Sequence, residues 1–249
     1  MSERNAWITG ASTGIGNALA KRMAKAGWQV AASARSADKL EELSQISNGA
    51  ITSHPLDVTD EADAVRVAGA VWDEVGPIDC AVFAAGLHIP VDATKLTAAP
   101  FRTLFEINLM GVVHCLAGIV PRMVKRGAGQ IAIVSSVAGY RGLPTASAYG
   151  ATKAALINMT ESLKFDLEPK GIKVQIVCPG FVRTPLTDQN PFPMPFLMEP
   201  DDAADRFYRG LMSNDFEVNF PRSFTTIMKQ VCKLPHGLYM RAMRRGTGF

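Results

Sequence analysis

The sequence predicts an α/β protein: a single domain built on a doubly wound parallel sheet with helices on both faces. Three observations support this prediction. Short apolar runs alternate with longer segments of helical periodicity along most of the chain, which is the pattern of parallel strands joined by helical crossovers. A glycine-rich turn joins the first strand to the first helix. The 249 residues contain no linker-like Gly/Ser tract and no internal repeat, so we expect one domain over residues 1–249.

The composition is that of an ordinary soluble globule, with 47% hydrophobic and 20% charged residues. No apolar run approaches the length of a membrane span, and the first residues lack a signal-peptide pattern. The four cysteines stand far apart without a C-x-x-C pair, which favours buried thiols in a reducing compartment over disulfides or a metal site. A net charge of +3 is too small to indicate nucleic-acid binding. We therefore expect a cytoplasmic protein without a metal centre.

The first strand and helix enclose a candidate anion site. Residues 6–8 form a short apolar run, residues 18–24 have helical periodicity, and Thr9-Gly10-Ala11-Ser12-Thr13-Gly14-Ile15-Gly16 lies between them. Backbone N–H groups and the helix dipole of such a turn face one point and favour a phosphate there. The alternative is that Gly10 only serves a tight turn.

The second strand, residues 28–33, ends in Ser33-Ala34-Arg35. In a dinucleotide site an acidic residue here would hold the adenosine ribose hydroxyl, and this chain has none. A guanidinium fits the oxygens of a phosphate, so Arg35 favours NADP(H), which carries a 2′-phosphate, over NAD(H). The alternative is that Arg35 is simply exposed at the end of the strand.

Helices and strands continue in alternation: residues 37–45, 51–56, 61–74 and 79–86. Asp57 and Val58 follow the third strand directly, which positions Asp57 for a ligand. A helix N-cap role for Asp57 or Thr59 is an equal alternative. Ala85 and Gly86 form a turn after the fourth strand, where a cofactor can approach the backbone closely.

The second half of the chain repeats the pattern over residues 101–126, 130–134, 154–168 and 173–178. Asn108 lies among apolar residues of the long helical segment, and an amide in such surroundings usually has a buried hydrogen-bond partner. The last predicted strand ends in Pro179-Gly180-Phe181-Val182-Arg183-Thr184. Ligands of such sheets bind at the carboxyl ends of the strands, where these residues lie.

A serine, a tyrosine and a lysine form the candidate reactive centre. Ser136 follows the strand at residues 130–134, and Tyr149 and Lys153 lie in the first turns of the next helix. Residues four apart share one helical face, and a nearby cation lowers the pKa of a tyrosine. Such a tyrosine can give or take a proton near neutral pH, while a serine hydroxyl stabilises the same reacting oxygen. A Tyr-x-x-x-Lys pair on a solvated helix is the alternative.

Taken together, these motifs resemble the short-chain dehydrogenase/reductase family in its compact, single-domain, Rossmann-like branch. The resemblance covers roughly the first three-quarters of the chain and rests on Thr9-Gly10-x-x-x-Gly14-Ile15-Gly16, Asp57, Ala85-Gly86, Asn108, Ser136, Tyr149, Lys153 and Pro179-Gly180-x-Val182-x-Thr184. Phe83-Ala84 replaces the usual pair of asparagines before Ala85. Thr13 stands where NADP-dependent members often carry a base, which leaves Arg35 as the identifiable 2′-phosphate ligand.

The resemblance implies catalytic roles for four residues. Tyr149 would be the acid in reduction and the base in oxidation. Lys153 would lower the pKa of Tyr149 and hold the nicotinamide ribose. Ser136, rather than Ser135, would bind the carbonyl oxygen, because it has the family's thirteen-residue distance to Tyr149. Asn108 would hold a water of the proton relay.

The resemblance also implies a cofactor site, in which Asp57 would contact adenine and Thr184 the nicotinamide carboxamide. The residues expected to contact the cofactor are Gly10, Ser12, Thr13, Gly14, Ile15, Gly16, Ser33, Arg35, Asp57, Val58, Ala85, Gly86, Asn108, Tyr149, Lys153, Pro179, Gly180, Val182 and Thr184.

The segment 185–215 is expected to form a substrate lid. The loop at residues 185–200 carries five prolines interleaved with large apolar residues, and so apolar a loop should pack over something. We predict an apolar pocket beneath it, shared with residues 87–89 and 140–143. The alternative is that the loop packs against the core or a partner subunit.

The extension at residues 222–249 is basic and contains no acid; its bases are Arg222, Lys229, Lys233, Arg241, Arg244 and Arg245. Apolar residues are interleaved with these bases, so the segment could lie on an anionic membrane. Docking on the body of the protein or on another subunit is favoured, because soluble folds use such helices more often. The family resemblance suggests a homodimer or homotetramer.

The sequence therefore predicts an NADP-preferring oxidoreductase, with NAD(H) as the alternative cofactor, that interconverts a carbonyl and a secondary alcohol on a moderately apolar small molecule. Two other functions stay open at this point. One is an epimerase or dehydratase that uses the same tyrosine and lysine, and the other is a non-catalytic NADP-binding scaffold.

Overall fold

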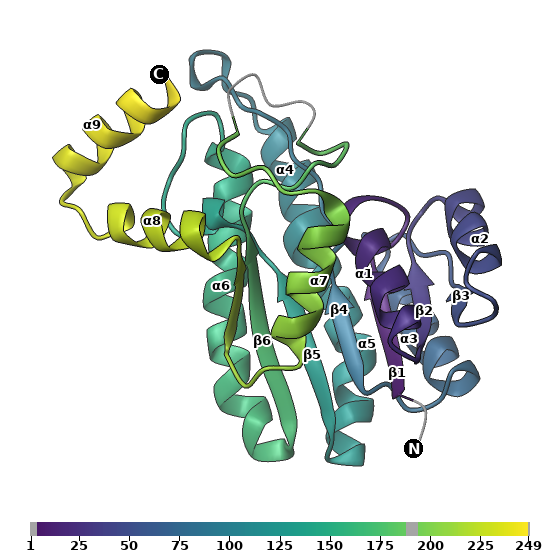
Figure 1. Ribbon diagram of the computed structural model, residues 1–249. Helices are drawn as coiled ribbons and strands as arrows, with labels where there is room; N and C mark the ends of the chain where they lie inside the picture. The colour runs from purple at the N-terminus through teal and green to yellow at the C-terminus, as the bar shows by residue number, and fades with distance from the viewer. Residues whose placement is uncertain (1–3, 188–193, 249) are drawn as a thin grey trace.

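The computed structural model describes residues 4–187 and 194–248. Their strands form one seven-stranded sheet, with every pairing parallel and the order β3-β2-β1-β4-β5-β6-β7 (Figure 1). The strands are β1 (Arg4–Thr9), β2 (Trp28–Ser33), β3 (Ile51–Ser53), β4 (Cys80–Phe83), β5 (Gly129–Val134), β6 (Ile172–Pro179) and β7 (Glu217–Phe220). This confirms the predicted parallel α/β fold. The strand order reverses between β1 and β4, where such sheets bind ligands.

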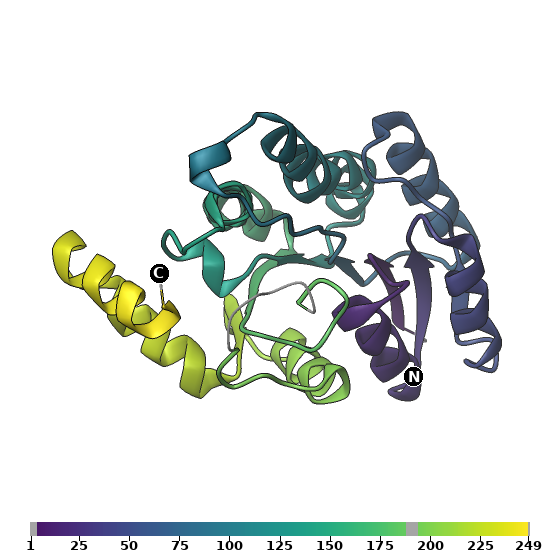
Figure 2. The same ribbon diagram turned by 90° about the horizontal axis from the view of Figure 1, so that it is seen from above.

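Helices cover both faces of the sheet, as the view from above shows (Figure 2). One layer contains α1 (Gly14–Lys25), α2 (Ala37–Gln45) and α7 (Pro200–Leu211), and the other contains α3 (Glu61–Glu74), α5 (Gly111–Arg126) and α6 (Ser147–Leu167). Successive strand residues point to opposite faces. Ile8 of β1 therefore packs in the core with Leu19 and Phe207, while its neighbour Trp7 packs in the opposite core with Ile119.

The long helix predicted at residues 101–126 is divided into three parts. A short α-helix, α4 (Ala99–Phe105), leads into a π-helical segment, Glu106–Met110, and then into α5 (Gly111–Arg126). Single π-helical turns are frequent at functional sites because they turn side chains out of the regular register. Here the irregular segment contains Asn108, which is fully buried.

Ala99–Arg126 is also long and apolar enough to cross a membrane by length and composition. The prediction that no apolar run approaches this length was therefore wrong. Half of its most apolar window is buried inside the protein. Cys115, Ile119 and Met123 of α5 have no exposed surface and belong to the core between the sheet and α3. The apolar character of the segment is thus that of a core helix.

The segment 185–215, predicted as a substrate lid, is only partly a loop in the structure. Its second half is the helix α7, in which Ala203, Ala204 and Phe207 are buried against the sheet and α1. A helix with such a buried face belongs to the layer that covers the sheet. Only the loop before Pro200 therefore remains as the predicted lid.

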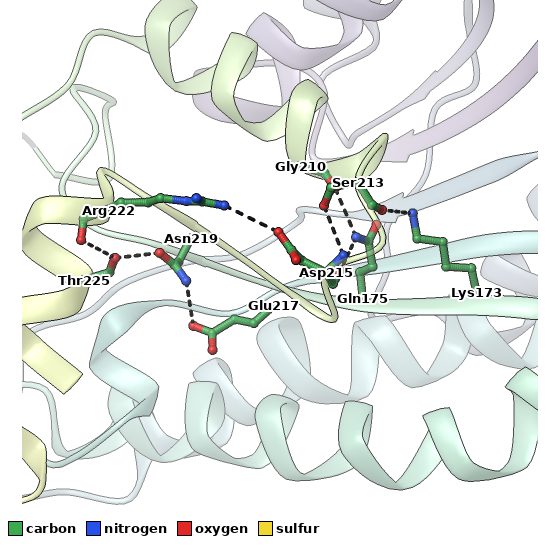
Figure 3. A network of polar contacts seen from close by, with 9 residues as sticks. All are labelled: Lys173, Gln175, Gly210, Ser213, Asp215, Glu217, Asn219, Arg222 and Thr225. Atoms are coloured by element: carbon green, nitrogen blue, oxygen red, sulfur yellow. Dashed lines mark hydrogen bonds and ion pairs between the residues drawn. The ribbon is translucent and has the colours of Figure 1, made fainter. Parts of the chain in front are cut away.

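The last strand, β7, and the helix that follows are held to β6 by a polar network (Figure 3). Nε2 of the buried Gln175 donates hydrogen bonds to the carbonyl oxygens of Gly210 and Asp215, at 3.1 and 2.6 Å. Beyond β7, Oγ1 of Thr225 donates to Oδ1 of Asn219 at 2.6 Å. These bonds fix where α8 (Arg222–Cys232) begins.

The second tail helix, α9 (His236–Thr247), docks on the body of the chain through one arginine. Nη1 of Arg141 donates to the carbonyl oxygens of Cys232 and Leu234, both at 2.7 Å. Its guanidinium carbon lies 4.1 Å from the ring centroid of Tyr239. The hydroxyl of this fully buried tyrosine donates to the Gly142 carbonyl oxygen at 2.8 Å. The tail therefore packs on its own subunit at the edge of the sheet (Figures 1 and 2).

Candidate active site

A cavity of about 590 Å³ opens at the carboxyl ends of the strands. The loops after β1, β2, β4, β5 and β6 line it, together with the start of α6 and the two tail helices. Because carboxyl ends of parallel strands share one edge of a sheet, side chains distant in sequence meet here. The cavity lies where the sequence predicted a ligand.

The glycine-rich turn after β1 forms the floor of one end of this cavity. Gly10 has a left-handed backbone with φ +73°, and a Cβ atom there would lie 2.6 Å from the backbone nitrogen of Ala85. A Cβ atom at Gly16 would lie 2.4 Å from the carbonyl oxygen of Gly10. The loops after β1 and β4 therefore touch backbone to backbone, which only glycine permits. The N-terminus of α1 at Gly14 faces the cavity from this turn and favours an anion there.

Arg35 and Asp57 line the same end of the cavity. The carboxylate of Asp57 accepts hydrogen bonds from the backbone nitrogen and the hydroxyl of Thr59, at 3.0 and 2.8 Å. These bonds, chiefly the one from the backbone, lower the pKa of Asp57, with a smaller contribution from the charge of Arg35. The N-cap of α3 is Asp60, whose carboxylate accepts from the backbone nitrogen of Asp63 at 2.9 Å. The alternative N-cap role for Asp57 or Thr59 was therefore wrong.

Most residues predicted to contact the cofactor line the cavity: Gly10, Ser12, Thr13, Gly14, Ile15, Gly16, Arg35, Asp57, Val58, Ala85, Gly86, Tyr149, Lys153, Pro179, Gly180, Val182 and Thr184. Ser33 does not. Its side chain is fully buried and its hydroxyl accepts a hydrogen bond from Nε1 of Trp7 at 3.0 Å. The structure therefore places Ser33 in the core and not in the cofactor site.

Asn108 also lies behind the cavity wall rather than in it. Its Oδ1 accepts from the backbone nitrogen of Leu87 at 2.7 Å, and its Nδ2 donates to the Leu87 carbonyl oxygen at 2.9 Å and to Oγ1 of Thr152 at 3.2 Å. Of its two predicted roles, the geometry supports the buried structural hydrogen bond. The amide clamps the loop that follows Gly86 against α6.

Ser136, Tyr149 and Lys153 meet at the centre of the cavity. Ser136 caps a short 3₁₀ turn, where its hydroxyl accepts a hydrogen bond from the backbone nitrogen of Ala138 at 3.1 Å, and it lies close enough to Tyr149 to act on the pKa of the phenol. Nζ of Lys153 lies 5.6 Å from the ring centroid of Tyr149 and donates to the Val134 carbonyl oxygen at 2.9 Å. The hydroxyl of Ser135 instead donates to the backbone oxygen of Lys153 at 2.8 Å. Of the two serines, Ser136 is thus the one beside the phenol.

Burial dominates the electrostatics of this centre. It raises the pKa of Tyr149 to about 12, with the hydrogen bond from Ser136 opposing the shift, and it lowers the pKa of Lys153 to about 8. The prediction that Lys153 brings the pKa of Tyr149 below its ordinary value was therefore wrong for this structure, because desolvation of the phenolate outweighs the opposing effect of Ser136. At neutral pH Tyr149 holds its proton, and Lys153 is mostly charged.

The other end of the cavity is apolar and is built largely by the tail. Phe224, Met228 and Val231 of α8 and Met243 of α9 line it, opposite Leu143. Sequence reasoning left the tail outside the site. Its signal was the spacing of Phe224, Met228 and Val231, which places three apolar side chains on one helical face.

The predicted lid contributes Pro185, Leu186, Thr187 and Pro195 to the cavity. Residues 188–193 lie outside the described part of the chain. Leu87 and His88 line the cavity as predicted, whereas Tyr140 instead bonds through its hydroxyl to Glu217.

Known proteins with a similar sequence or structure include oxidoreductases and dehydrogenases. The model of the short chain dehydrogenase family matches residues 4–192. A Myxococcus xanthus (strain DK1622) protein described as an uncharacterized oxidoreductase is 38% identical over 248 residues, which are 98% of both chains. A short-chain dehydrogenase from Streptomyces avermitilis superposes with a TM-score of 0.83 at 27% identity, over 98% of this chain and 96% of that one. ElxO, solved with NADP bound, gives 0.78 at 25% identity, over 88% of this chain and 98% of its own. This chain is therefore an NAD(P)-dependent oxidoreductase of the short-chain dehydrogenase/reductase family.

Proposed function

We propose that this enzyme prefers NADP(H) and interconverts a carbonyl and a secondary alcohol on a moderately apolar small molecule. One observation carries the proposal. The half-buried phenol of Tyr149 and the hydroxyl of Ser136 share one cavity with the glycine turn at one end and an apolar wall at the other. A dinucleotide on the glycine turn and an apolar carbonyl compound against the wall would meet at Tyr149.

The residues present fit a nicotinamide dinucleotide. The glycine turn after β1 and the N-terminus of α1 line the cavity, so their backbone N–H groups can approach a pyrophosphate there. Arg35 and Asp57 would lie at the adenosine end, and Lys153 and Thr184 at the nicotinamide end. When bound, the nicotinamide supplies or accepts a hydride.

Tyr149 moves the proton in this mechanism. Because burial raises its pKa to about 12, the phenol is protonated at neutral pH and can donate to the oxygen of a carbonyl. Ser136 would hydrogen-bond the same oxygen and stabilise the charge that develops on it. The negative charge left on Tyr149 would form near the ammonium group of Lys153, which is held in place by the Val134 carbonyl oxygen.

Arg35 supports the preference for NADP(H). It is an exposed cation at the end of β2, it lines the cavity, and β2 carries no acidic residue at that end. The similarity to ElxO, solved with NADP bound, agrees with this assignment.

Replacing Arg35 with alanine should weaken NADPH binding by roughly 10- to 100-fold, the worth of a charge-assisted phosphate contact, and leave NADH binding nearly unchanged. Fluorescence titration with both cofactors measures this. Lys39→Ala removes an exposed cation of α2 and is the matched control. Equal losses for NADPH and NADH in Arg35→Ala would contradict the preference.

Replacing Tyr149 with phenylalanine tests the reaction itself. The ring keeps its packing but loses the proton donor, so turnover should fall by at least about 1000-fold while NADPH affinity stays within a few-fold. The assay is NADPH oxidation with a panel of ketones and aldehydes, beside a cofactor titration. Activity near that of the wild type would overturn the role of Tyr149. NADPH binding by the wild type without turnover of any carbonyl or alcohol would instead indicate a scaffold.

A further inference from the structure

We infer that His88 is a specificity-determining residue, which hydrogen-bonds an oxygen substituent on the carbon next to the reacting carbonyl. The preferred substrates would then be α-hydroxyketones or α-diketones with an apolar remainder. The inference rests on the proposed function and names the substrate class for that site.

The first argument is the position of His88. Its ring lies edge-on to the ring of Tyr149, with centroids 4.7 Å apart and planes at 67°, and it lines the same cavity. Because the two rings are in contact, a substrate whose carbonyl oxygen reaches the Tyr149 hydroxyl would have a neighbouring carbon beside His88. The imidazole is therefore next to the reacting centre without belonging to the Ser136, Tyr149 and Lys153 group.

The second argument is that the surrounding structure fixes this position. Asn108 binds both backbone polar groups of Leu87, the residue before His88, at 2.7 and 2.9 Å. Leu87 and Ile89 pack in a small apolar cluster with Leu104 and Tyr149. The backbone on both sides of His88 is therefore held in place, so the position of the ring is preorganised for a ligand and little conformational entropy is lost on binding.

The third argument is the unsatisfied polarity of the ring. Within the described residues, Nδ1 of His88 is buried and has no hydrogen-bond partner. The whole residue is only 8% exposed, and burial lowers the pKa of the imidazole, which keeps it neutral. A neutral imidazole carries one N–H donor and one lone pair, and a buried polar group without a partner is unfavourable. Half a turn of the ring about the Cβ–Cγ bond exchanges Nδ1 with Cδ2, so either edge can present a nitrogen.

The fourth argument comes from what a substrate would displace. The wall around the substrate end of the cavity is apolar, with Leu143, Phe224 and Met228. A purely hydrocarbon substrate would offer the imidazole no hydrogen-bond partner. A substrate with a hydroxyl or a second carbonyl oxygen at this point would hydrogen-bond the nitrogen that the ring presents to the cavity, and the apolar wall accepts the rest of the molecule.

The test compares 2-hexanone with 2,3-hexanedione and 3-hydroxy-2-hexanone, which share one carbon skeleton. The readout is the ratio of kcat/KM for each oxygenated ketone to that for 2-hexanone, measured by NADPH oxidation in the wild type, His88→Phe and His88→Gln. An adjacent oxygen also activates a carbonyl chemically, so the ratio is compared between variants. Phenylalanine keeps the ring packing on Tyr149, and glutamine keeps a donor and an acceptor.

We expect His88→Phe to lower both ratios by about tenfold or more, with the change mainly in KM, and His88→Gln to retain most of the preference. NADPH titration of each variant checks that the cofactor site is intact. Ratios in His88→Phe equal to those of the wild type, or equally low ratios in both variants, would overturn the inference alone. Failure of the wild type to reduce any of the three ketones, despite binding NADPH, would overturn the proposed function as well.

Discussion

Replacing Arg141 with alanine should release the helix α9 from the body of the protein. The guanidinium makes two hydrogen bonds of 2.7 Å to the carbonyl oxygens of Cys232 and Leu234, and it stacks on Tyr239 at 4.1 Å. Hydrogen bonds from a charged donor contribute about 1.5–3 kcal/mol each when buried, and a cation–π contact about 0.5–2 kcal/mol. Arg141 is only half-buried, so we expect a local loss of about 2–4 kcal/mol.

Hydrogen exchange of the α9 amides measures this loss. At tenfold per 1.4 kcal/mol, exchange should accelerate by roughly 30- to 1000-fold in α9, and little in the strands of the core. Because Met243, Gly246 and Thr247 of α9 line the cavity, KM for larger apolar ketones should also rise. Arg245→Ala is the control, since it removes an exposed cation from the same helix. Unchanged exchange in α9, or equal acceleration throughout the protein, would refute the reasoning.

Two further predictions concern stability. Gln175→Leu removes the shared partner of the Gly210 and Asp215 carbonyl oxygens and of the Gln130 amide. Urea titration should therefore show that the free energy of unfolding falls by about 2–4 kcal/mol. A fall of less than about 1 kcal/mol would contradict the role of this network. Burial lowers the pKa of Lys153 to about 8 in the folded protein, from its ordinary value of 10.5 in the unfolded chain. The unfolded state therefore binds more protons between pH 8 and pH 10.5, and over this range the free energy of unfolding should rise by about 3 kcal/mol relative to that of Lys153→Met. Parallel pH profiles of the two proteins would contradict the lowered pKa of Lys153.

Much of the fold follows from local patterns. The alternation of apolar runs and helical periodicity, with glycine turns between them, predicted a parallel sheet and its order of elements along the chain. Since such sheets gather the carboxyl ends of their strands at one edge, the same reasoning placed Gly10, Ser136 and Tyr149 in one cavity. The structure confirms that they line it together.

The features that were missed depend on partners distant in sequence. Ser33 belongs to the core because its hydroxyl accepts a hydrogen bond from the indole of Trp7, on the neighbouring strand. The strand β7 is only four residues long, with Val218 and Phe220 buried in alternation, which is too short a pattern to predict alone. Its pairing is fixed by contacts such as those of Gln175 on β6.

The sequence also did not predict the pKa of Tyr149 or the part of the tail in the cavity. The pKa of Tyr149 is the balance of burial against a hydrogen bond from Ser136, and burial depends on the complete packing around the phenol. The sequence showed an amphipathic tail, but only its docking through Arg141 reveals which apolar side chains face the cavity. A periodic pattern identifies a buried face without naming what buries it.

Reduction of a ketone with NADPH that carries deuterium at the transferable C4 position tests the central claim most directly. If the cavity aligns a nicotinamide with a carbonyl beside Tyr149, each NADPH consumed should yield one alcohol with deuterium on the carbinol carbon. Tyr149→Phe should abolish this transfer while still binding the cofactor. Product formation without deuterium, or without stoichiometric NADPH oxidation, would contradict hydride transfer to a carbonyl.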